Sequence, residues 1–517
     1  MNIQQKLKDN ITSLRLVLEN NGKKLNSQQV EQLKRYSGFG GLKQVLWGDG
    51  PIETWSEASE SDKKLYPLYQ ELYQLLDDNL TGREYKAVLD SLKNSILTAF
   101  YTPTVIPRVF YEVLQKYHNP QNLLEPSAGV GVFITEAKGI LDLNYIVSYE
   151  KDVLTGKLLE TIVPRTWNDG MSSPTRTEGG VAFENSDPGE EDFDLIVSNI
   201  PFGAHPVYDD KLPLEVKTKI HNYFFAKGLE KLREGGILAY LVTSAFLDTV
   251  TNKSAREYLF NRADFISLTV MPDNLMWETG GTQAPSHFLV VRKNSKKTLL
   301  STEEQLLCVS ENTQVGNGKA NVTISRNKYI AEHNTDIVLG SMKVGTNQYG
   351  KPNIEVLWSG NINDIAESFR NVLERDFRAR YTITGKQYIQ MQSTWVNEGT
   401  IPETATWDKI DIGQPKTEFP LPDDYVEASH IQIPGDTTDG ITDDWEDEDS
   451  LGIGVDHEDE QEDYTESQEV VEQQGDAYNE PQQTEPVKKL SKRDQEVLKS
   501  YYKIKEAYKN LEENGTG

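Results

Sequence analysis

The feature that most constrains the fold is a series of short apolar runs between residues 96 and 295, each separated from the next by an amphipathic stretch. The runs are NLLEP, YIVSYE, FDLIVSN, ILAYLVTS, ISLTV and HFLVVRK. Short apolar runs are typical of buried strands, and amphipathic stretches are typical of helices. The alternation predicts an α/β fold of the Rossmann-like kind, a mainly parallel sheet with helices on both faces.

The rest of the chain divides into four further predicted units. Residues 1–95 form a helical N-terminal domain, interrupted by the glycine-rich segment YSGFGGL, which allows close approach of the backbone. Residues 296–416 mix the strand-like segments CVSEN, NVTIS and IEVLW with the helical segment INDIAESFRNVLERDF. This region is predicted to be an α/β accessory or target-recognition region. An acidic linker (417–487) and a basic amphipathic helix (488–517) follow.

The net charge of −28 comes almost entirely from the linker. Residues 417–487 contain 24 Asp and Glu and no Lys or Arg, which leaves a balance of −4 for the other residues. Like charges at this density repel one another and bury little apolar surface, so the linker is expected to be disordered. A solvated linker is therefore favoured over a folded mimic of DNA.

Composition also excludes several classes of protein. The single cysteine, Cys308, excludes a disulfide framework and a cysteine-based metal cluster, and seven scattered histidines disfavour a zinc site. The N-terminus MNIQQKLKDN lacks the apolar core of a signal peptide, and no apolar stretch approaches membrane-spanning length. We expect a cytoplasmic protein that binds no metal and contacts no membrane.

The first predicted strand runs into a glycine-containing turn, NLLEPSAGVGVF. Glu125 lies at the end of the strand, and Gly129 and Gly131 would let the backbone approach a ligand closely. Ligands of open parallel sheets bind at this end of the strands. The segment lacks the third glycine of the dinucleotide fingerprint, so a plain strand-to-helix turn is an equal alternative.

The next two strand ends carry further candidate ligand contacts. Glu150 closes YIVSYE, where an acid typically accepts both hydroxyls of a ribose, although a solvated loop acid is an equal alternative. Phe183 and Glu184, in VAFENSD, could flank and hydrogen-bond an adenine ring.

A fourth strand, FDLIV, ends in SNIPFG (198–203). Two carbonyl groups and the ring of Phe202 could grip a flat heterocycle that carries an amino group. The alternative is an ordinary turn, in which Pro201 stops the strand and Phe202 packs into the core.

Four such strand ends in this order resemble the AdoMet-dependent methyltransferases. SNIPFG resembles the Asn/Asp/Ser-Pro-Pro-aromatic motif of the amino-methylating DNA methyltransferases of the N6-adenine type. FYTP (100–103) resembles the element that wraps the methionine end of AdoMet. It precedes the glycine turn, as in the gamma arrangement of motifs.

The resemblance extends over roughly residues 30–295. The segments YSGFGGL, TAFYTPTVI, LLEPSAGVGVF, YEKDVLTGKLL, VSNIPFG, IHNYFF and LREGGILAYLVTS resemble the methylase module of large methylase–helicase proteins. Those proteins are carried by conjugative elements, plasmids and phages, notably in Bacteroidetes. No Gly-x4-Gly-Lys-Ser/Thr loop is present, which implies a helicase partner or a missing helicase half.

The resemblance implies a cofactor, a substrate and a set of site residues. AdoMet would be bound by Tyr101, Thr102, Pro103, Glu125, Pro126, Ser127, Ala128, Gly129, Gly131, Phe133, Glu150, Lys151, Phe183, Glu184 and Asn199. The catalytic residues would be Asn199, Ile200, Pro201 and Phe202, acting on an adenine flipped out of DNA. The Asn199 side-chain oxygen and the Ile200 carbonyl would accept the two amino hydrogens, while Phe202 stacks on the base.

Two positions depart from the family pattern. Ile200 stands where a proline is usual, and His287 stands where an Asp is expected before the last strand. Because the first position acts through its main-chain carbonyl, we expect replacement of Ile200 by proline to change activity little. His221, Asn222 and Tyr223, in IHNYFF, are assigned to the same end of the sheet, with a helix cap as an equal alternative.

Two other functions remain open. RNA- and glutamine-directed methyltransferases also carry Asn-Pro-Pro-Tyr loops. A non-catalytic module of the AdoMet fold that binds DNA or a partner protein is compatible with the substitutions at Ile200 and His287.

Overall fold

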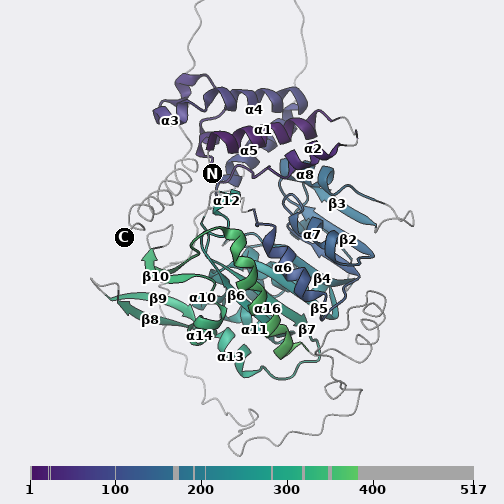
Figure 1. Ribbon diagram of the computed structural model, residues 1–517, viewed down its shortest axis with the longest axis vertical. Helices are drawn as coiled ribbons and strands as arrows, with labels where there is room; N and C mark the ends of the chain where they lie inside the picture. The colour runs from purple at the N-terminus through teal and green to yellow at the C-terminus, as the bar shows by residue number, and fades with distance from the viewer. Residues whose placement is uncertain are drawn as a thin grey trace, which may run out of the picture.

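The computed structural model describes residues 3–381 except 21–22, 24, 99–100, 167–173, 190–191, 204, 281–282, 317–320 and 347–351. A seven-stranded sheet lies below a layer of N-terminal helices (Figure 1). Its strands, in spatial order, are β3 (Thr175–Gly179), β2 (Tyr145–Glu150), β1 (Asn122–Glu125), β4 (Phe193–Asn199), β5 (Leu232–Thr243), β7 (Ser286–Lys293) and β6 (Ala263–Met271). The predicted linker and basic helix, 417–517, lie outside the described residues.

The sheet is parallel except at one strand. Strands β1 to β5 pair in parallel, whereas β7 is inserted between β5 and β6 and runs antiparallel to both. The strand order reverses direction between β1 and β4, which is the point where ligands bind in such folds. The predicted α/β Rossmann-like fold is confirmed.

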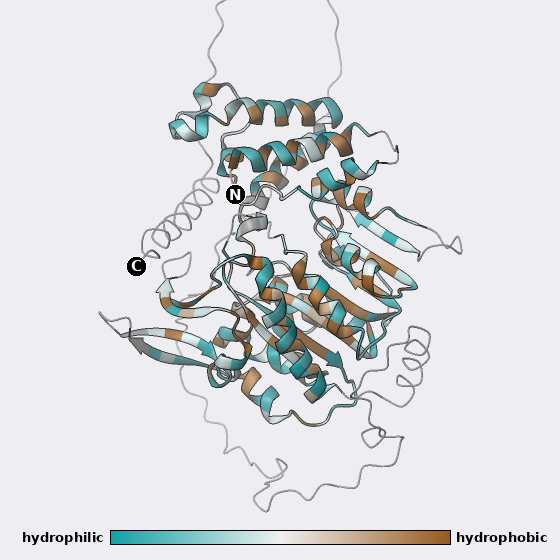
Figure 2. Cartoon of the chain, viewed as in Figure 1, coloured by the Kyte–Doolittle hydropathy of each residue, from teal (hydrophilic) through white to brown (hydrophobic). Residues whose placement is uncertain are grey.

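Helices cover both faces of the sheet, and their apolar sides meet it in two separate cores (Figure 2). The first face is covered by α6 (Val105–Leu114), α7 (Val132–Ile140) and α16 (Ile365–Arg380). The opposite face is covered by α9 (Ile220–Lys231), α10 (Ala245–Asp248), α11 (Lys253–Phe260), α13 (Thr302–Cys308) and α14 (Lys328–Glu332). On the first face Phe288 of β7 contacts the rings of Phe110 and Phe369, at 5.2 and 5.3 Å between centroids.

The N-terminal residues are helical, as predicted. The helices are α1 (Ile3–Leu18), α2 (Ser27–Leu33), α3 (Glu60–Lys63), α4 (Tyr66–Asn79) and α5 (Gly82–Thr98), with 3-10 turns η1 (Lys43–Trp47) and η2 (Ile52–Trp55). They enclose a third core around Trp47, Trp55 and Tyr69. This core also takes in one side of α8 (Val153–Ile162), the helix that connects β2 to β3.

Two hairpins precede α16. They are formed by β8 (Ser310–Gly316) with β9 (Asn321–Asn327) and by β10 (Ser341–Thr346) with β11 (Pro352–Leu357). The predicted strand CVSEN begins later than expected because Cys308 ends α13, a helix fixed at its start by a capping box between Ser301 and Glu304. The described residues also form short elements: α12 (Trp277–Gly280), α15 (Asn334–Ile337), η3 (Phe183–Asn185), η4 (Leu214–Val216), η5 (Val250–Asn252) and η6 (Ile362–Asp364). None of the described helices is long and apolar enough to cross a membrane.

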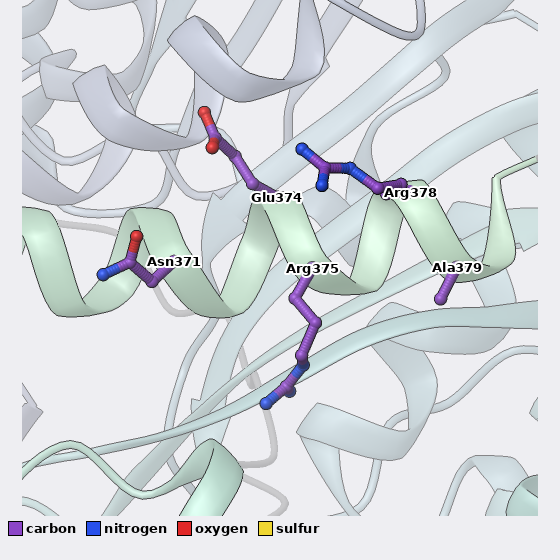
Figure 3. Close-up of a pocket in the computed structure, with 5 residues that line it drawn as sticks. All are labelled: Asn371, Glu374, Arg375, Arg378 and Ala379. Carbon is purple, nitrogen blue, oxygen red and sulfur yellow. The ribbon is translucent and has the colours of Figure 1, made fainter. Parts of the chain in front are cut away.

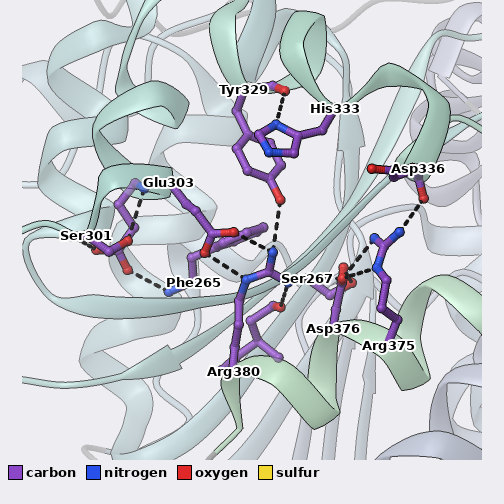
Figure 4. A network of polar contacts seen from close by, with 12 residues as sticks. Phe265, Ser267, Ser301, Glu303, Tyr329, His333, Asp336, Arg375, Asp376 and Arg380 are labelled. Atoms are coloured by element: carbon purple, nitrogen blue, oxygen red, sulfur yellow. Dashed lines mark hydrogen bonds and ion pairs between the residues drawn. The ribbon is translucent and has the colours of Figure 1, made fainter.

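A network of ion pairs around one buried carboxylate fixes α16 against the sheet (Figure 4). Asp376, 1% exposed, accepts a hydrogen bond from Ser267 of β6 at 2.8 Å and pairs with Arg375 and Arg380. Arg380 also binds Glu303 of α13 with two nitrogens, at 2.6 and 2.8 Å. The network therefore ties the last described helix to elements far earlier in the sequence.

The outer surface of α16 carries a shallow depression lined by Asn371, Glu374, Arg375, Arg378 and Ala379 (Figure 3). All five residues come from one helix. Just beyond that helix, Tyr381 bonds His118, whose other ring nitrogen lies 3.2 Å from the Asp194 carbonyl at the start of β4. The end of α16 that carries Arg378 and Ala379 therefore lies toward the amino end of β4, away from the edge where ligands of such sheets bind.

Candidate functional site

The carboxyl edge of the sheet brings three predicted strand ends together at the β1–β4 switch point. Glu125 ends β1, Glu150 ends β2 and Asn199 ends β4. The glycine turn crosses this edge, because the Ser198 hydroxyl of β4 donates to the Ser127 carbonyl at 2.9 Å. That bond could not be predicted, since a serine at a strand end has no motif of its own.

The two glycines of the turn have different reasons to be glycine. Gly129 and Gly131 both have left-handed backbones, with φ of 55° and 82°. A Cβ at Gly129 would meet nothing within 4 Å, so this position borders open space. A Cβ at Gly131 would lie 2.8 Å from Val163 and 2.9 Å from Leu159. Gly131 therefore allows close packing on α8, and only Gly129 offers room for a ligand.

The carboxylate of Glu150 is held by two main-chain donors. Its Oε2 atom accepts the Gly129 N–H at 2.7 Å, and its Oε1 atom accepts the Asp152 N–H at 2.8 Å. Burial raises the pKa of Glu150 to about 7, and the charge of Asp152 adds to the rise. Each oxygen keeps a second lone pair, so this carboxylate can still accept hydroxyl groups.

Glu125 is more deeply buried, at 1% exposed. Burial raises its pKa well above the ordinary range, and the charge of Glu150 raises it further. Its Oε2 atom has no hydrogen-bond partner among the described residues. A buried oxygen that lacks a hydrogen-bond partner suits a donor or a cation supplied by a ligand.

The segment before α6 lies beside the same turn. Thr102 and Pro103 are buried, and Tyr101 is half-buried with its hydroxyl 3.4 Å from the Thr155 hydroxyl of α8. The Tyr101 carbonyl accepts a hydrogen bond from Thr279. Burial raises the pKa of Tyr101, and the charges of Asp152 and Glu150 add to the rise.

The predicted adenine contacts are arranged differently from the expectation. Phe183 is 1% exposed and packs under α9, with its ring 5.1 Å from Phe224 and 4.6 Å from the Lys227 ammonium. Contact between its ring and an adenine would therefore need the side chain to move. Glu184 forms an ion pair with the exposed Lys151 at 3.1 Å. The binding roles of all three residues stay predictions.

Two other members of the predicted set lie in the body of the fold. Phe133 is 2% exposed and packs in the core from α7, while Ala128 is 5% exposed and its N–H donates to the Tyr149 carbonyl at 2.8 Å. Pro126 and Ala128 are buried and Ser127 is half-buried, so this part of the turn would meet a ligand mainly through its backbone.

The segment SNIPFG extends β4 by one residue. The Ile200 N–H donates to the Leu241 carbonyl at 3.1 Å, and the Ile200 side chain is 1% exposed in the core under α9. Pro201 and Phe202 are half-buried, and Phe202 packs against the core of the opposite face. Proline at position 200 would lack that N–H donor, which is a cost in stability, while the expectation that activity changes little stays a prediction.

His221 and Asn222 of α9 are buried next to this edge. Asn222 donates to the Asn252 side chain at 3.2 Å, and Asn252 donates to the Ala245 carbonyl at 2.8 Å and lies 3.4 Å from His221 Nε2. Burial lowers the pKa of His221 to about 3, so the ring is neutral. These side chains pack inside the helix layer, which agrees with a structural contribution.

His287 occupies the position at which an acid was expected. It is 2% exposed, and its Nε2 atom is 3.9 Å from Asp248 Oδ2. Burial lowers the pKa of His287 to about 3 and raises that of Asp248 to about 6. Its strand neighbours Val242 and Val270 belong to the core under α9, so His287 faces the side of the sheet opposite Phe202. Among the described residues, no three His, Cys, Asp or Glu side chains converge to hold a metal ion.

Comparisons with known proteins agree with the region that carries the site. Residues 121–275 match the family model described as Eco57I restriction-modification methylase. Defense against restriction protein B of Escherichia phage P1 is 25% identical over 200 residues, which are 38% of this chain and 8% of that protein. The type II methyltransferase M.CvrRI of Paramecium bursaria Chlorella virus XZ-6E is 21% identical over 274 residues, 52% of this chain and 67% of that protein.

Among solved structures, a type I restriction-modification system methyltransferase subunit from Streptococcus thermophilus aligns with 71% of this chain and 79% of its own. The identity is 14% and the TM-score 0.32. The chain thus spans a small part of the phage protein's length and about two thirds of the viral methyltransferase.

Proposed function

We propose that this chain is an AdoMet-dependent DNA methyltransferase that modifies the N6 amino group of adenine. The observation that carries the proposal is the Glu150 carboxylate, bonded to the Gly129 N–H at the switch point, beside the strand that ends in SNIPFG. The match of residues 121–275 to a methylase family supports it. The adenine specificity rests on the resemblance of SNIPFG to the amino-methylating motif.

The residues at the switch point fit AdoMet. The buried Oε2 atom of Glu125, which has no partner among the described residues, suits an ammonium group such as that of the methionine moiety. The remaining lone pairs of Glu150 suit the ribose hydroxyls. The open space beside Gly129 allows the ligand to approach the backbone between these two acids.

The cofactor supplies a methyl group activated by its sulfonium, so the protein has to position and desolvate the acceptor amine. The Asn199 side-chain oxygen and the Ile200 carbonyl would accept its two hydrogens and stabilise the positive charge that develops on nitrogen. Phe202 would stack on the base, a contact worth about 1–3 kcal/mol per base. Extrusion of a base from the duplex costs on the order of a few kcal/mol, and the stacking contact offsets part of that cost.

Mass spectrometry of digested DNA tests the proposal. DNA treated with the protein and AdoMet should contain N6-methyladenine, and DNA treated with an Asn199→Ala variant should not. Parallel reactions with RNA and with glutamine-containing protein separate the alternative methyltransferases. AdoMet binding without methylation of any of the three substrates would instead indicate a non-catalytic module.

The predicted origin in a mobile element and the predicted helicase partner rest on sequence resemblance. The phage relative is named for defence against restriction and is far longer than the region it shares with this chain. We propose that a helicase acts with this methylase region, in the same chain or as a separate protein. Co-purification of a helicase with the tagged protein from its native host would test this.

A further inference from the structure

The N-terminal helices do more than cap the fold, because they cover the glycine turn itself. Val130 lies between Gly129 and Gly131 and is 7% exposed. It belongs to the N-terminal core, together with residues of α1 and α2 such as Leu7 and Leu33. One side of the turn that contacts Glu150 is therefore formed by packing against residues more than 90 positions earlier in the chain.

The segment YSGFGGL is held rigidly over this region by α1. Asn10, which is fully buried, donates to the Gly38 carbonyl at 2.7 Å and accepts the Ser37 N–H at 2.9 Å. The buried ammonium of Lys6 donates to the Gly40 carbonyl at 2.8 Å. Side chains of α1 thus satisfy the main-chain groups of a turn that has no strand or helix of its own.

The segment YSGFGGL packs directly against Tyr101. Gly38 has φ of 63°, and a Cβ placed there would lie 2.4 Å from Tyr101 Cε2 and 2.6 Å from its hydroxyl oxygen. The ring of Tyr36 meets the Tyr101 ring edge-on, with centroids 6.0 Å apart and planes at 83°. Gly38 is therefore required for a close approach as well as for its backbone conformation, and the position of Tyr101 depends on this turn.

A second contact from the N-terminal unit reaches the acid side of the site. Ser91 of α5 donates a hydrogen bond to the Asp152 carboxylate. Asp152 caps α8 through Thr155, and its N–H bonds Glu150. The N-terminal helices therefore contact both sides of the switch point, through Tyr101 and through Asp152.

We infer that the N-terminal helical unit is a functional part of the cofactor site, and that the segment YSGFGGL (36–42) positions Tyr101 for AdoMet. Tyr101 is a residue of the site, whereas Gly38, Tyr36 and Asn10 act through it as positioning residues. The inference rests on the proposed function, since it concerns where that cofactor binds.

The test compares Gly38→Ala with Gly48→Ala in the full chain. Gly48 also has positive φ, 73°, but a Cβ there would meet nothing within 4 Å, so both variants carry backbone strain and only one pushes on Tyr101. Titration calorimetry should show AdoMet affinity lowered about tenfold or more by Gly38→Ala, because small misplacements of a binding group cost this much or more. Gly48→Ala should stay within about twofold of the parent, because its strain lies away from the site.

A double-mutant comparison identifies the route of the effect. If Gly38 acts through Tyr101, Gly38→Ala should weaken binding far less in a Tyr101→Ala background than in the parent. If Gly38→Ala does not fold, Tyr36→Leu replaces it, because this change removes the ring that contacts Tyr101; AdoMet affinity should again fall.

The two proposals fail in different ways. A parent protein that binds no AdoMet would refute the proposed function. A parent that binds AdoMet, with Gly38→Ala and Gly48→Ala weakening it equally, would refute the inference alone. So would a folded Tyr36→Leu variant with parental affinity.

Discussion

Replacement of Glu150 by glutamine is expected to weaken AdoMet binding without disturbing the shape of the site. The carboxylate accepts the Gly129 and Asp152 N–H groups at 2.7 and 2.8 Å, whereas a glutamine has one acceptor oxygen and must turn its NH₂ group toward one of these donors. The glutamine also presents the ribose hydroxyls with an NH₂ group in place of one charged acceptor, and loss of one hydrogen bond to a charged acceptor costs about 1.5–3 kcal/mol. At about 1.4 kcal/mol per factor of ten, the affinity should fall about 10- to 150-fold.

The pH dependence of binding gives this prediction a second, independent arm. Because the pKa of Glu150 is about 7, the parent carboxylate is ionised at pH 8 and mostly protonated at pH 6. A protonated carboxyl offers fewer acceptor sites, so parental AdoMet affinity should be about tenfold lower at pH 6 than at pH 8. The Glu150→Gln variant should show a much flatter profile between these values.

Titration calorimetry at pH 6, 7 and 8 measures both effects, with Gly48→Ala as a control for a substitution away from the site. Asp152 and Lys151 also lie near Glu150, and the charge of Lys151 lowers the pKa of Glu150. A Glu150→Gln variant that kept the full parental pH slope would assign the titration to another group, such as Glu125. A variant with parental affinity would refute the assignment of Glu150 to the ribose, whereas a retained slope alone would refute only its assignment as the titrating group.

Three further predictions concern other parts of the chain. Asn199→Ala should lower turnover by a factor of about 100 or more, as for other transition-state acceptors, while AdoMet affinity stays nearly constant; equal loss of both would indicate a structural role. Ile200→Pro should lower the free energy of unfolding by about 1–3 kcal/mol, because it leaves the Leu241 carbonyl without its donor; an unchanged denaturant midpoint would contradict this. A chain ending near Lys416 should fold, keep methyl transfer and bind DNA more strongly at low salt, where charge repulsion is least screened. Loss of the cooperative unfolding transition on truncation would show that the acidic linker packs on the fold.

The fold could be predicted from the sequence because its strands are short and apolar and are separated by turns and amphipathic stretches. The runs with Glu125 and Glu150 at their ends became β1 and β2 with the same ends, and the strand FDLIV became β4, which continues two residues further to Asn199. The reversed strand β7 could not be predicted, because HFLVVRK has the same apolar pattern as a parallel strand. Strand direction depends on which neighbours pair, and this is a property of the whole sheet.

The candidate site was predictable in its strand ends but not in its supporting contacts. From the sequence, Gly129 and Gly131 are both predicted to face a ligand, with Glu150 beside them. In the structure Gly131 packs on α8 and only Gly129 borders open space, and this difference depends on where α8 lies. The sequence pattern assigned Phe183 to adenine because the residue follows a strand. In the structure α9 covers this ring, a contact that no local pattern reports because Phe224 is more than 40 residues away, and the role of Phe183 in adenine binding stays a prediction.

The return of α16 to the sheet has a consequence for how this protein is made. The bond between Ser267 and Asp376 joins residues 109 positions apart, and the apolar face beneath α16 has no cover from that helix until it has been synthesised. At a translation rate of about 5–20 residues per second, β6 leaves the ribosome roughly 5–20 seconds before α16. Nascent chains in that interval present an apolar surface on one side of a nearly complete sheet. They are therefore expected to be clients of cellular chaperones, and a rare-codon delay between residues 271 and 365 would lengthen their exposure to aggregation.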